Sequence, residues 1–309
     1  MEIIRLDLAN IKPVKKLTLC LGYFDGIHTG HQAVIKTALD NSLNGPVGVL
    51  TFSMAPGAVL KKYQREKVLT SIEDRARILE EIGVSYLFVL EFNEQISKLS
   101  ADDFLLRIIN KIRPQLIVCG EDYHFGVRGS GNWKTLKKYF NVMVTPIYPS
   151  SENKVSSTRI FNMIENGEVD LVKEYLGYRY TITGRVDKGD GIGSKELVPT
   201  ANITLLHNYL LPKNGVYFVK IRIKNYPALY GLANIGVIPT LKNLPEPRLE
   251  IYIDDFNDNI YGQMVMIEFR VFIREEMKFA SVTELKKQID KDIKLIEALK
   301  LEDNRLTSF

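Results

Sequence analysis

Short apolar runs alternate with amphipathic segments along the first half of the chain. The runs predict buried strands at residues 17–21, 47–52, 86–90, 115–119 and 142–147. Apolar residues at helical spacing, with capping residues before two of the segments, predict helices at residues 31–41, 71–83 and 100–113. Strands that alternate with helices in units of this size indicate a doubly wound parallel sheet, in which ligands bind at the carboxyl ends of the strands.

The pattern changes in the second half of the chain. Two short helices are predicted within residues 158–176, and from Tyr180 to Phe272 strand-like runs are separated by Gly, Pro, Asn and Asp. Strands without intervening helices predict an antiparallel sheet or a small barrel. One apolar stripe between Val282 and Leu299 predicts a terminal helix. We therefore expect an α/β domain of residues 1–180 and a mainly β domain of residues 181–309.

The composition is typical of a soluble globular protein. Hydrophobic residues make up 45% of the 309 positions and charged residues 25%. The net charge of +4 is too small to indicate nucleic-acid binding. Two cysteines, Cys20 and Cys119, end apolar runs and argue against a disulfide framework or a zinc site. The sequence shows neither a secretory leader nor a stretch long enough to span a bilayer, so we expect a cytoplasmic protein without membrane partners.

The first candidate site is the segment Gly-Tyr-Phe-Asp-Gly-Ile-His-Thr-Gly-His at residues 22–31. It follows the first of these predicted strands and opens the first helix. Its glycines permit close approach of a ligand, and the helix N-terminus offers unpaired N–H groups to an anion. His28 and His31 can both reach a triphosphate from this loop. A phosphate site is therefore favoured over the alternative, a glycine-rich turn with two solvent-exposed histidines.

Two further clusters follow the carboxyl ends of later strands. Residues 120–126, Gly-Glu-Asp-Tyr-His-Phe-Gly, bring carboxylates, aromatic rings and a histidine to the same edge, unless Tyr123 and Phe125 only fill the core. Residues 155–159, Val-Ser-Ser-Thr-Arg, place hydroxyls and one arginine at a helix start, which makes either an anion site or an ordinary N-cap. A role in ligand binding is favoured for both clusters because they lie at the same edge of the predicted sheet as the first loop.

These motifs, in this order, resemble those of the bacterial bifunctional riboflavin kinase/FAD synthetases over nearly the full length of the chain. The resemblance implies that the first domain transfers an adenylyl group from ATP to FMN with Mg²⁺, giving FAD and pyrophosphate without a covalent intermediate. It implies that His28 and His31 are catalytic and contact the ATP phosphates. The implied ATP site also contains Gly22, Phe24, Asp25, Gly26, Ser156, Ser157, Thr158 and Arg159. The implied FMN site contains Asp122, Tyr123 and Phe125.

The second half resembles the riboflavin kinase module of the same family through the motif Pro-Thr-Ala-Asn at residues 199–202. The module would phosphorylate riboflavin with ATP. The implied ATP and Mg²⁺ site contains Gly189, Gly193, Thr200 and Asn202, the last two as metal ligands. Glu250 is implied as the general base that takes the proton of the ribityl 5′-hydroxyl. Glu250 and Arg274 are implied to bind the flavin.

The chain departs from the family pattern at several positions. In the first half, the histidine usual after the second strand is missing from residues 52–56, and two usual arginines are His124 and Phe161. In the second half, the phosphate flap has Ser194 and Leu197 where an arginine and a glycine are usual. A further arginine and a histidine of the family are replaced by Ile238 and Tyr252. The kinase half therefore departs more from its family than the adenylyltransferase half.

Three functions follow from these observations. The first is a bifunctional enzyme that makes FMN from riboflavin and FAD from FMN. The second is a monofunctional FAD synthetase whose kinase domain is degenerate and only binds flavin. The third is a flavin-sensing protein without turnover, against which His28, Glu250 and the two phosphate loops argue. The expected partners are flavins and ATP rather than nucleic acid or membrane.

Overall fold

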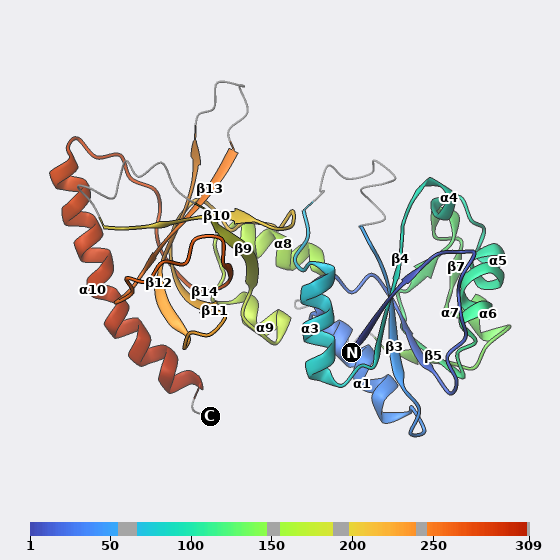
Figure 1. Ribbon diagram of the computed structural model, residues 1–309. Coiled ribbons are helices and arrows are strands. Elements are labelled where there is room, and N and C mark those ends of the chain that lie inside the picture. The colour runs from blue at the N-terminus through green and yellow to red at the C-terminus, as the bar shows by residue number, and fades with distance from the viewer. Residues whose placement is uncertain (55–66, 147–154, 188–197, 239–245, 308–309) are drawn as a thin grey trace. The chain divides into compact units, whose positions relative to one another are not determined.

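The computed structural model describes residues 1–54, 67–146, 155–187, 198–238 and 246–307. Contacts within the chain divide it into two compact units, Met1–Ser157 and Thr158–Phe309 (Figure 1). Within the described ranges, no helix has both the length and the apolar character needed to cross a membrane. The two units differ in class, as the two sequence patterns predicted.

The first unit contains a six-stranded parallel sheet in the order β1-β4-β3-β2-β5-β8. Its strands are β1 (Glu2–Leu6), β2 (Thr18–Leu21), β3 (Val47–Phe52), β4 (Tyr86–Leu90), β5 (Leu116–Gly120) and β8 (Val142–Thr145). From β2 the chain first builds toward β4 on one side, then crosses to β5 and β8 on the other. The switch point therefore lies between β2 and β5, and the loops after these strands flank it.

The predicted strands of this sheet are confirmed, and one strand was missed. β1 lies at the edge of the sheet beside β4, and its residues are mostly exposed. A short edge strand of this kind has neither a long apolar run nor a clear alternation, so the pattern did not predict it. A small hairpin of β6 (His124–Phe125) and β7 (Gly131–Asn132) was missed for the same reason.

Helices connect these strands in the predicted order. They are η1 (Asp25–Ile27), α1 (Thr29–Asp40), α3 (Ile72–Ile82), α4 (Glu94–Ser97), α5 (Ala101–Phe104), the π-helical turn η2 (Leu105–Ile109), α6 (Asn110–Ile112), η3 (Val127–Gly129) and α7 (Trp133–Lys137). Ser71 and Asp74 form the predicted capping box of α3, which ends at Gly83 with φ 103°. Helix side chains such as Phe104 and Ile108 pack with Leu19 in the core of the first unit.

The second unit is a closed antiparallel barrel preceded by two helices and followed by one. α8 (Ser157–Glu165) and α9 (Val172–Leu176) lead into the strands β9 (Thr181–Asp187), β10 (Ala201–Leu205), β11 (Gly215–Ile223), β12 (Leu229–Ile238), β13 (Glu246–Ile253) and β14 (Met264–Arg274). The strand order is β10-β13-β12-β11-β14-β9, which closes on itself. Of the two predicted architectures, open sheet or small barrel, the structure shows the barrel.

The contact division falls at Ser157, before α8, whereas the change of sequence pattern predicted a boundary near residue 180. The cause is visible in the backbone, because the N–H of Lys213 donates to the carbonyl of Ile164 in α8 at 3.2 Å. A Cβ at Gly167, just after α8, would also lie 3.3 Å from the hydroxyl of Tyr217 in the barrel. The helices before residue 180 thus pack with the barrel.

The terminal helix α10 (Val282–Thr307) packs on the barrel through an apolar contact and ion pairs. Ile296 is fully buried against Val216, Phe218 and Leu232 of the barrel strands. Farther along, Asp303 pairs with the buried Arg270 of β14 at 2.8 Å. The apolar stripe of the sequence correctly predicted this helix, but the ion pairs that attach it link residues far apart in the chain.

Candidate active sites

The loop after β2 has an unusual backbone. Phe24, Gly26 and Ile27 have φ values of 54°, 74° and 35°. Glycine suits such values, but each non-glycine residue held there costs about 1–3 kcal/mol, and a β-branched residue is a clear outlier. Gly22 is required for another reason, because a Cβ there would lie 2.8 Å from the ring of Phe24. The surrounding structure must therefore hold this loop in place.

His28 is the N-cap of α1, and this role orients its ring. The backbone N–H of His31 donates to His28 Nδ1 at 3.3 Å. The two imidazole rings stack with centroids 3.7 Å apart and an interplanar angle of 14°. The ring of Phe24, itself buried, lies 5.0 Å from that of His31. The two histidines predicted to act together thus form one unit at the start of the helix.

Burial controls the charge of these histidines. Desolvation lowers the pKa of His28 to about 4, although the nearby carboxylates of Asp25 and Asp122 act in the opposite direction. Desolvation also lowers the pKa of His31 well below its ordinary value, and the positive charge that His28 carries when protonated, together with that of Arg75, lowers it further. Both rings are therefore neutral at pH 7. Because His28 Nδ1 accepts a hydrogen bond, its proton lies on Nε2, which becomes a donor for an anion.

One buried polar atom of this loop, Nδ1 of His31, lacks a hydrogen-bond partner among the described residues. Buried polar groups are normally paired with protein or ordered water, so such an atom at a sheet switch point is a mark of a ligand site. This observation agrees with the predicted phosphate site.

The carboxylate of Asp25 is directed into the protein and is about 2% exposed. It accepts hydrogen bonds from the N–H groups of Leu69 and Thr70 at 3.2 and 3.0 Å and from the Thr70 hydroxyl at 3.0 Å. It also forms an ion pair with Arg75 Nη2 at 3.1 Å. In this arrangement the side chain of Asp25 fixes the loop from behind.

Arg75 was not recognised from the sequence. It is the fourth residue of α3 and shares one helix face with the apolar residues Ile78, Leu79 and Ile82. A charged residue on a buried helix face needs partners, and this was the signal that could have identified it. The side chain is 2% exposed and contacts residues of three other segments.

The predicted FMN residues lie after β5. The rings of Tyr123 and Phe125 stack with centroids 5.8 Å apart, and Phe125 packs on Phe104 at 5.4 Å. Phe125 is a buried member of the core and Tyr123 is half-buried against it. Asp122 is exposed, and its negative charge acts to raise the pKa of His28. A role of these three residues in FMN binding stays a prediction.

The third predicted motif begins two residues before α8. The hydroxyl of Ser157, the last residue of the first unit, donates to the backbone carbonyl of Asp25 in the histidine loop at 3.3 Å. Ser156 is half-buried beside it and Thr158 is exposed. Arg159 belongs to the second unit, where its guanidinium lies 4.7 Å from the ring centroid of Tyr175.

In the barrel, strand register brings the predicted kinase residues together. Asn202 of β10 lies directly opposite Glu250 of β13, and Asn234 of β12 lies opposite Glu250 on the other side. Cross-strand partners of this kind have neighbouring side chains. Thr200 is exposed just before β10. The positions of Gly189, Gly193, Ser194 and Leu197 lie outside the described residues.

A second arginine that the sequence did not reveal bridges these residues. Arg248 donates from Nε and Nη2 to Asn202 Oδ1 at 3.1 and 2.8 Å, and it forms an ion pair with Glu250. Arg248 and Glu250 are two residues apart in β13 and therefore lie on the same face of the strand, which a strand pattern can predict. Their contact with Asn202 depends on strand pairing that the pattern does not contain.

Arg274, predicted to bind flavin, is held by the terminal helix. It donates from Nε and Nη2 to Asp292 Oδ2 at 2.9 and 2.7 Å, and Gln288 donates to the other oxygen of the same carboxylate at 2.8 Å. The position of its guanidinium therefore depends on α10. Its flavin-binding role stays a prediction.

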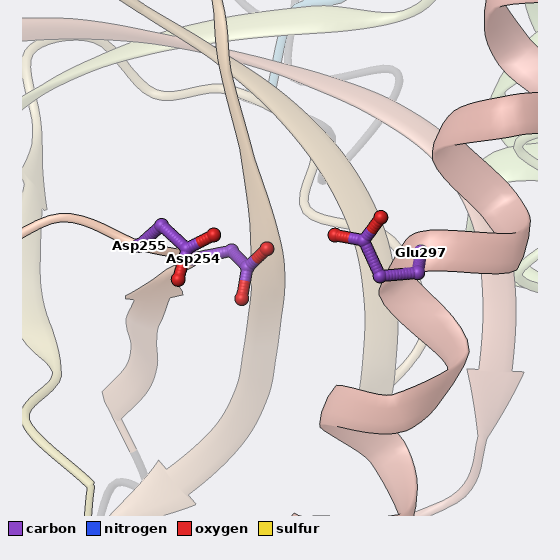
Figure 2. Close-up of side chains that lie close together, drawn as sticks. All are labelled: Asp254, Asp255 and Glu297. Carbon is purple, nitrogen blue, oxygen red and sulfur yellow. The ribbon is translucent and has the colours of Figure 1, made fainter.

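Three carboxylates gather between the barrel and α10, namely Asp254, Asp255 and Glu297 (Figure 2). The ammonium of Lys300 pairs with Asp254 and lies 2.9 Å from Glu297 Oε1. The Lys300 cation therefore neutralises part of the charge of this cluster, and its ion pair with Asp254 helps to attach α10 to the barrel.

A parallel sheet with paired histidines at its switch point, joined to a barrel with Asn202 beside Glu250, defines a two-domain protein of nucleotide chemistry. Residues 11–159 match the family described as FAD synthetase. Residues 176–300 match the family described as riboflavin kinase.

Relatives match both halves at once. The bifunctional riboflavin kinase/FMN adenylyltransferase of Listeria monocytogenes is 38% identical over 92% of this chain and 93% of its own length. The corresponding protein of Bacillus subtilis is 36% identical over 90% of both. This chain therefore belongs to the bifunctional riboflavin kinase/FMN adenylyltransferase family.

A solved structure shares the whole fold. It is the crystal structure of a Streptococcus pneumoniae protein called a macrolide-efflux protein, with a TM-score of 0.87 and 32% identity over 96% of this chain and 99% of that chain. Its name describes another role than the names of the sequence relatives, so the likeness concerns the fold.

Proposed function

We propose that this protein synthesises FAD in two steps, with riboflavin phosphorylated to FMN in the second unit and FMN adenylylated in the first. The observation that carries the proposal is the stacked, neutral pair His28 and His31 at the N-terminus of α1, within a chain that matches both family domains. The two domains and the full-length relatives favour this function over a monofunctional FAD synthetase with a degenerate kinase domain.

In the adenylyl transfer, a phosphate oxygen of FMN attacks the α-phosphorus of ATP, and the bond from that phosphorus to the bridging oxygen breaks. Pyrophosphate leaves with the electron pair of that bond. Negative charge grows on the phosphates during the transfer. His28 donates to them from Nε2, and so do the first N–H groups of α1. Neutral donors suit this task because they need not exchange a proton with solvent. Ser156, Ser157, Thr158 and Arg159 are proposed to complete the phosphate site.

In the kinase reaction, the ribityl 5′-hydroxyl of riboflavin attacks the γ-phosphorus of ATP, and ADP leaves. Glu250 accepts the hydroxyl proton during the attack. It is half-buried and lies opposite Asn202, so a base and a phosphate-side ligand are adjacent. FMN released from this reaction is the substrate of the first unit.

The side-chain oxygens of Asn202 and Thr200 in the second unit are of the kind that a magnesium ion takes as ligands. Asn202 Oδ1 already binds a cation, the guanidinium of Arg248, which also pairs with Glu250. Carboxylate and amide oxygens are the ligands that Mg²⁺ takes in phosphoryl transfer sites. Asn202 and Thr200 would hold Mg²⁺, which supplies neutralisation of the ATP phosphate charge when it is bound.

A cytoplasmic location is part of the proposal. Cys20 and Cys119 lie on the neighbouring strands β2 and β5 and are both buried, free thiols. Free thiols agree with a reducing compartment.

The deciding experiment is an end-point chromatographic assay of the full chain with ATP and Mg²⁺, with riboflavin in one reaction and FMN in the other. The proposal predicts FAD from both reactions, with FMN as an intermediate in the first. FAD from FMN alone would favour the monofunctional enzyme, and the absence of FMN and FAD products would contradict both.

A further inference from the structure

An ion pair that the chemistry above does not use lies directly behind the histidine loop. Asp25, in the loop, and Arg75, in α3, are 50 residues apart and pair at 3.1 Å with side chains about 3% and 2% exposed. We propose that Arg75 is a positioning residue of the adenylyl transfer site, which holds the loop of His28 and His31 in its reactive geometry through Asp25. This inference rests on the proposed adenylyltransferase function.

The guanidinium of Arg75 joins three segments. Its Nη1 donates to the carbonyl of Tyr23 in the loop at 3.2 Å and to the hydroxyl of Thr51 at the end of β3 at 3.0 Å. Its Nε donates to the hydroxyl of Thr70, before α3, at 3.2 Å, and that hydroxyl accepts the N–H of Gly26 at 2.9 Å. All three nitrogens thus bind groups that touch residues 23–26.

The loop needs such support because its backbone is strained. Phe24 and Ile27 both have positive φ, on either side of Asp25 and Gly26. A strained conformation persists only where its surroundings determine it fully. Released from Asp25, the chain would relax toward negative φ at these residues, and His28, the next residue, would move with it.

Arg75 acts through the loop and not on substrate. Its guanidinium also lies 4.6 Å from the ring centroid of Tyr23, so the ring covers it in addition to the polar partners. Each of its three nitrogens already donates to a protein group, so the guanidinium is directed at the loop and its supports and not at a phosphate. The histidines and the α1 N-terminus, in contrast, have donors available.

The test compares variants of the full chain in FAD formation from FMN and ATP. Arg75→Met is expected to lower kcat by about 10–100-fold, the order of loss caused by a misplacement near 1 Å, with a much smaller change in KM for ATP. Arg75→Lys is expected to restore part of the loss. Thr51→Val, which keeps the shape and removes one hydroxyl partner of Arg75, is expected to lower kcat less. Arg77→Met, also in α3 but with a partly exposed side chain paired to Glu81, is the matched control and is expected to leave kcat unchanged.

Riboflavin phosphorylation by the same samples reports that the rest of the chain is intact, and it is expected to stay unchanged. The imidazole NMR signals of His28 and His31 report loop geometry without substrate, and Arg75→Met but not Arg77→Met is expected to shift them. Wild-type kcat in both Arg75→Met and Thr51→Val would overturn the proposal. The proposal would also be overturned if Arg75→Met lost folded protein and both activities to the same extent while Thr51→Val had no effect, because Arg75 would then serve only stability. If the wild-type protein makes no FAD, the proposed function fails, and the histidine signals alone decide the role of Arg75.

Discussion

The imidazole of His28 lies parallel to that of His31, 3.7 Å away, and accepts the backbone N–H of His31 at its Nδ1. One contact thus caps a helix, stacks two rings and selects the tautomer of the first. The arrangement presents a neutral N–H donor at the positive end of a helix, where it would stabilise the leaving pyrophosphate of the proposed adenylyl transfer without a proton exchange.

The charge state of this pair is testable by NMR titration of the free protein. Because desolvation lowers the pKa of His28 to about 4, its ring is expected to stay neutral as pH falls from 7 through the ordinary histidine range. Signals are assigned with His28→Asn and His31→Asn. The unfolded chain takes up this proton near pH 6.5 and the folded protein only near pH 4. The free energy of unfolding is therefore expected to decrease as the pH is lowered from 6.5 to about 4. A normal titration of His28 would contradict the assigned environment.

The histidines are expected to serve one activity only. Replacing His28 and His31 together with Ala removes the proposed phosphate donors, so FAD formation from FMN is expected to fall by about 10²–10⁴-fold. Riboflavin phosphorylation is expected to be unchanged, because the kinase residues lie in the other unit. His207→Ala, on the barrel, is the histidine control. Equal loss of both activities would show that the two sites are not independent.

Glu250→Gln is expected to have the converse effect. The amide keeps the shape of the side chain but cannot accept the 5′-hydroxyl proton, so kcat of riboflavin phosphorylation is expected to fall by about 10²–10⁴-fold. FAD formation from FMN is the internal measure of an intact chain. Glu297→Gln removes an exposed carboxylate of α10 and is expected to leave kcat unchanged. Full kinase activity of Glu250→Gln would exclude it as the base.

Arg248 is expected to compete with Mg²⁺ for Asn202. Its guanidinium donates twice to the oxygen proposed as a metal ligand. Arg248→Met frees that oxygen for the metal. A hydrogen bond to a charged group contributes about 1.5–3 kcal/mol, and the lower value corresponds to about a tenfold change in affinity. The Mg²⁺ concentration that gives half-maximal kinase activity is therefore expected to fall about tenfold. Arg222→Met, a more exposed position in the barrel, is the control. Loss of kinase activity with an unchanged Mg²⁺ requirement would instead make Arg248 a phosphate ligand.

The contact between α10 and the barrel is expected to depend on Ile296. This side chain is fully buried against Val216 and Phe218, so Ile296→Ala is expected to destabilise the second unit by about 2–5 kcal/mol. Differential scanning calorimetry measures the effect. The neighbouring Leu295, 44% exposed, gives the control Leu295→Ala, for which less than about 0.5 kcal/mol is expected. Equal effects of the two variants would contradict this packing.

The order of elements could be predicted from the sequence because the information is local. The capping box of Ser71 and Asp74, the apolar period of α10 and the loop with His28 and His31 each lie within a few turns of chain. Side-chain period and capping chemistry depend on neighbours in sequence, and so they predicted the class of both units and the loop in which the first site is proposed.

Only the tertiary structure decided what holds these pieces in place. The closed barrel, the pairing of Asn202 with Glu250 and the bridge of Arg248 depend on strand register, and Arg75 meets Asp25 across 50 residues of chain. A buried charge is stable only with partners, and those partners come from segments that the local pattern treats as independent. The sequence alone therefore determined the order of the elements and which motif residues, such as His28 and Glu250, are candidates for each site. Long-range packing decided which further groups, Arg75 and Arg248 among them, surround those residues and how the residues are buried.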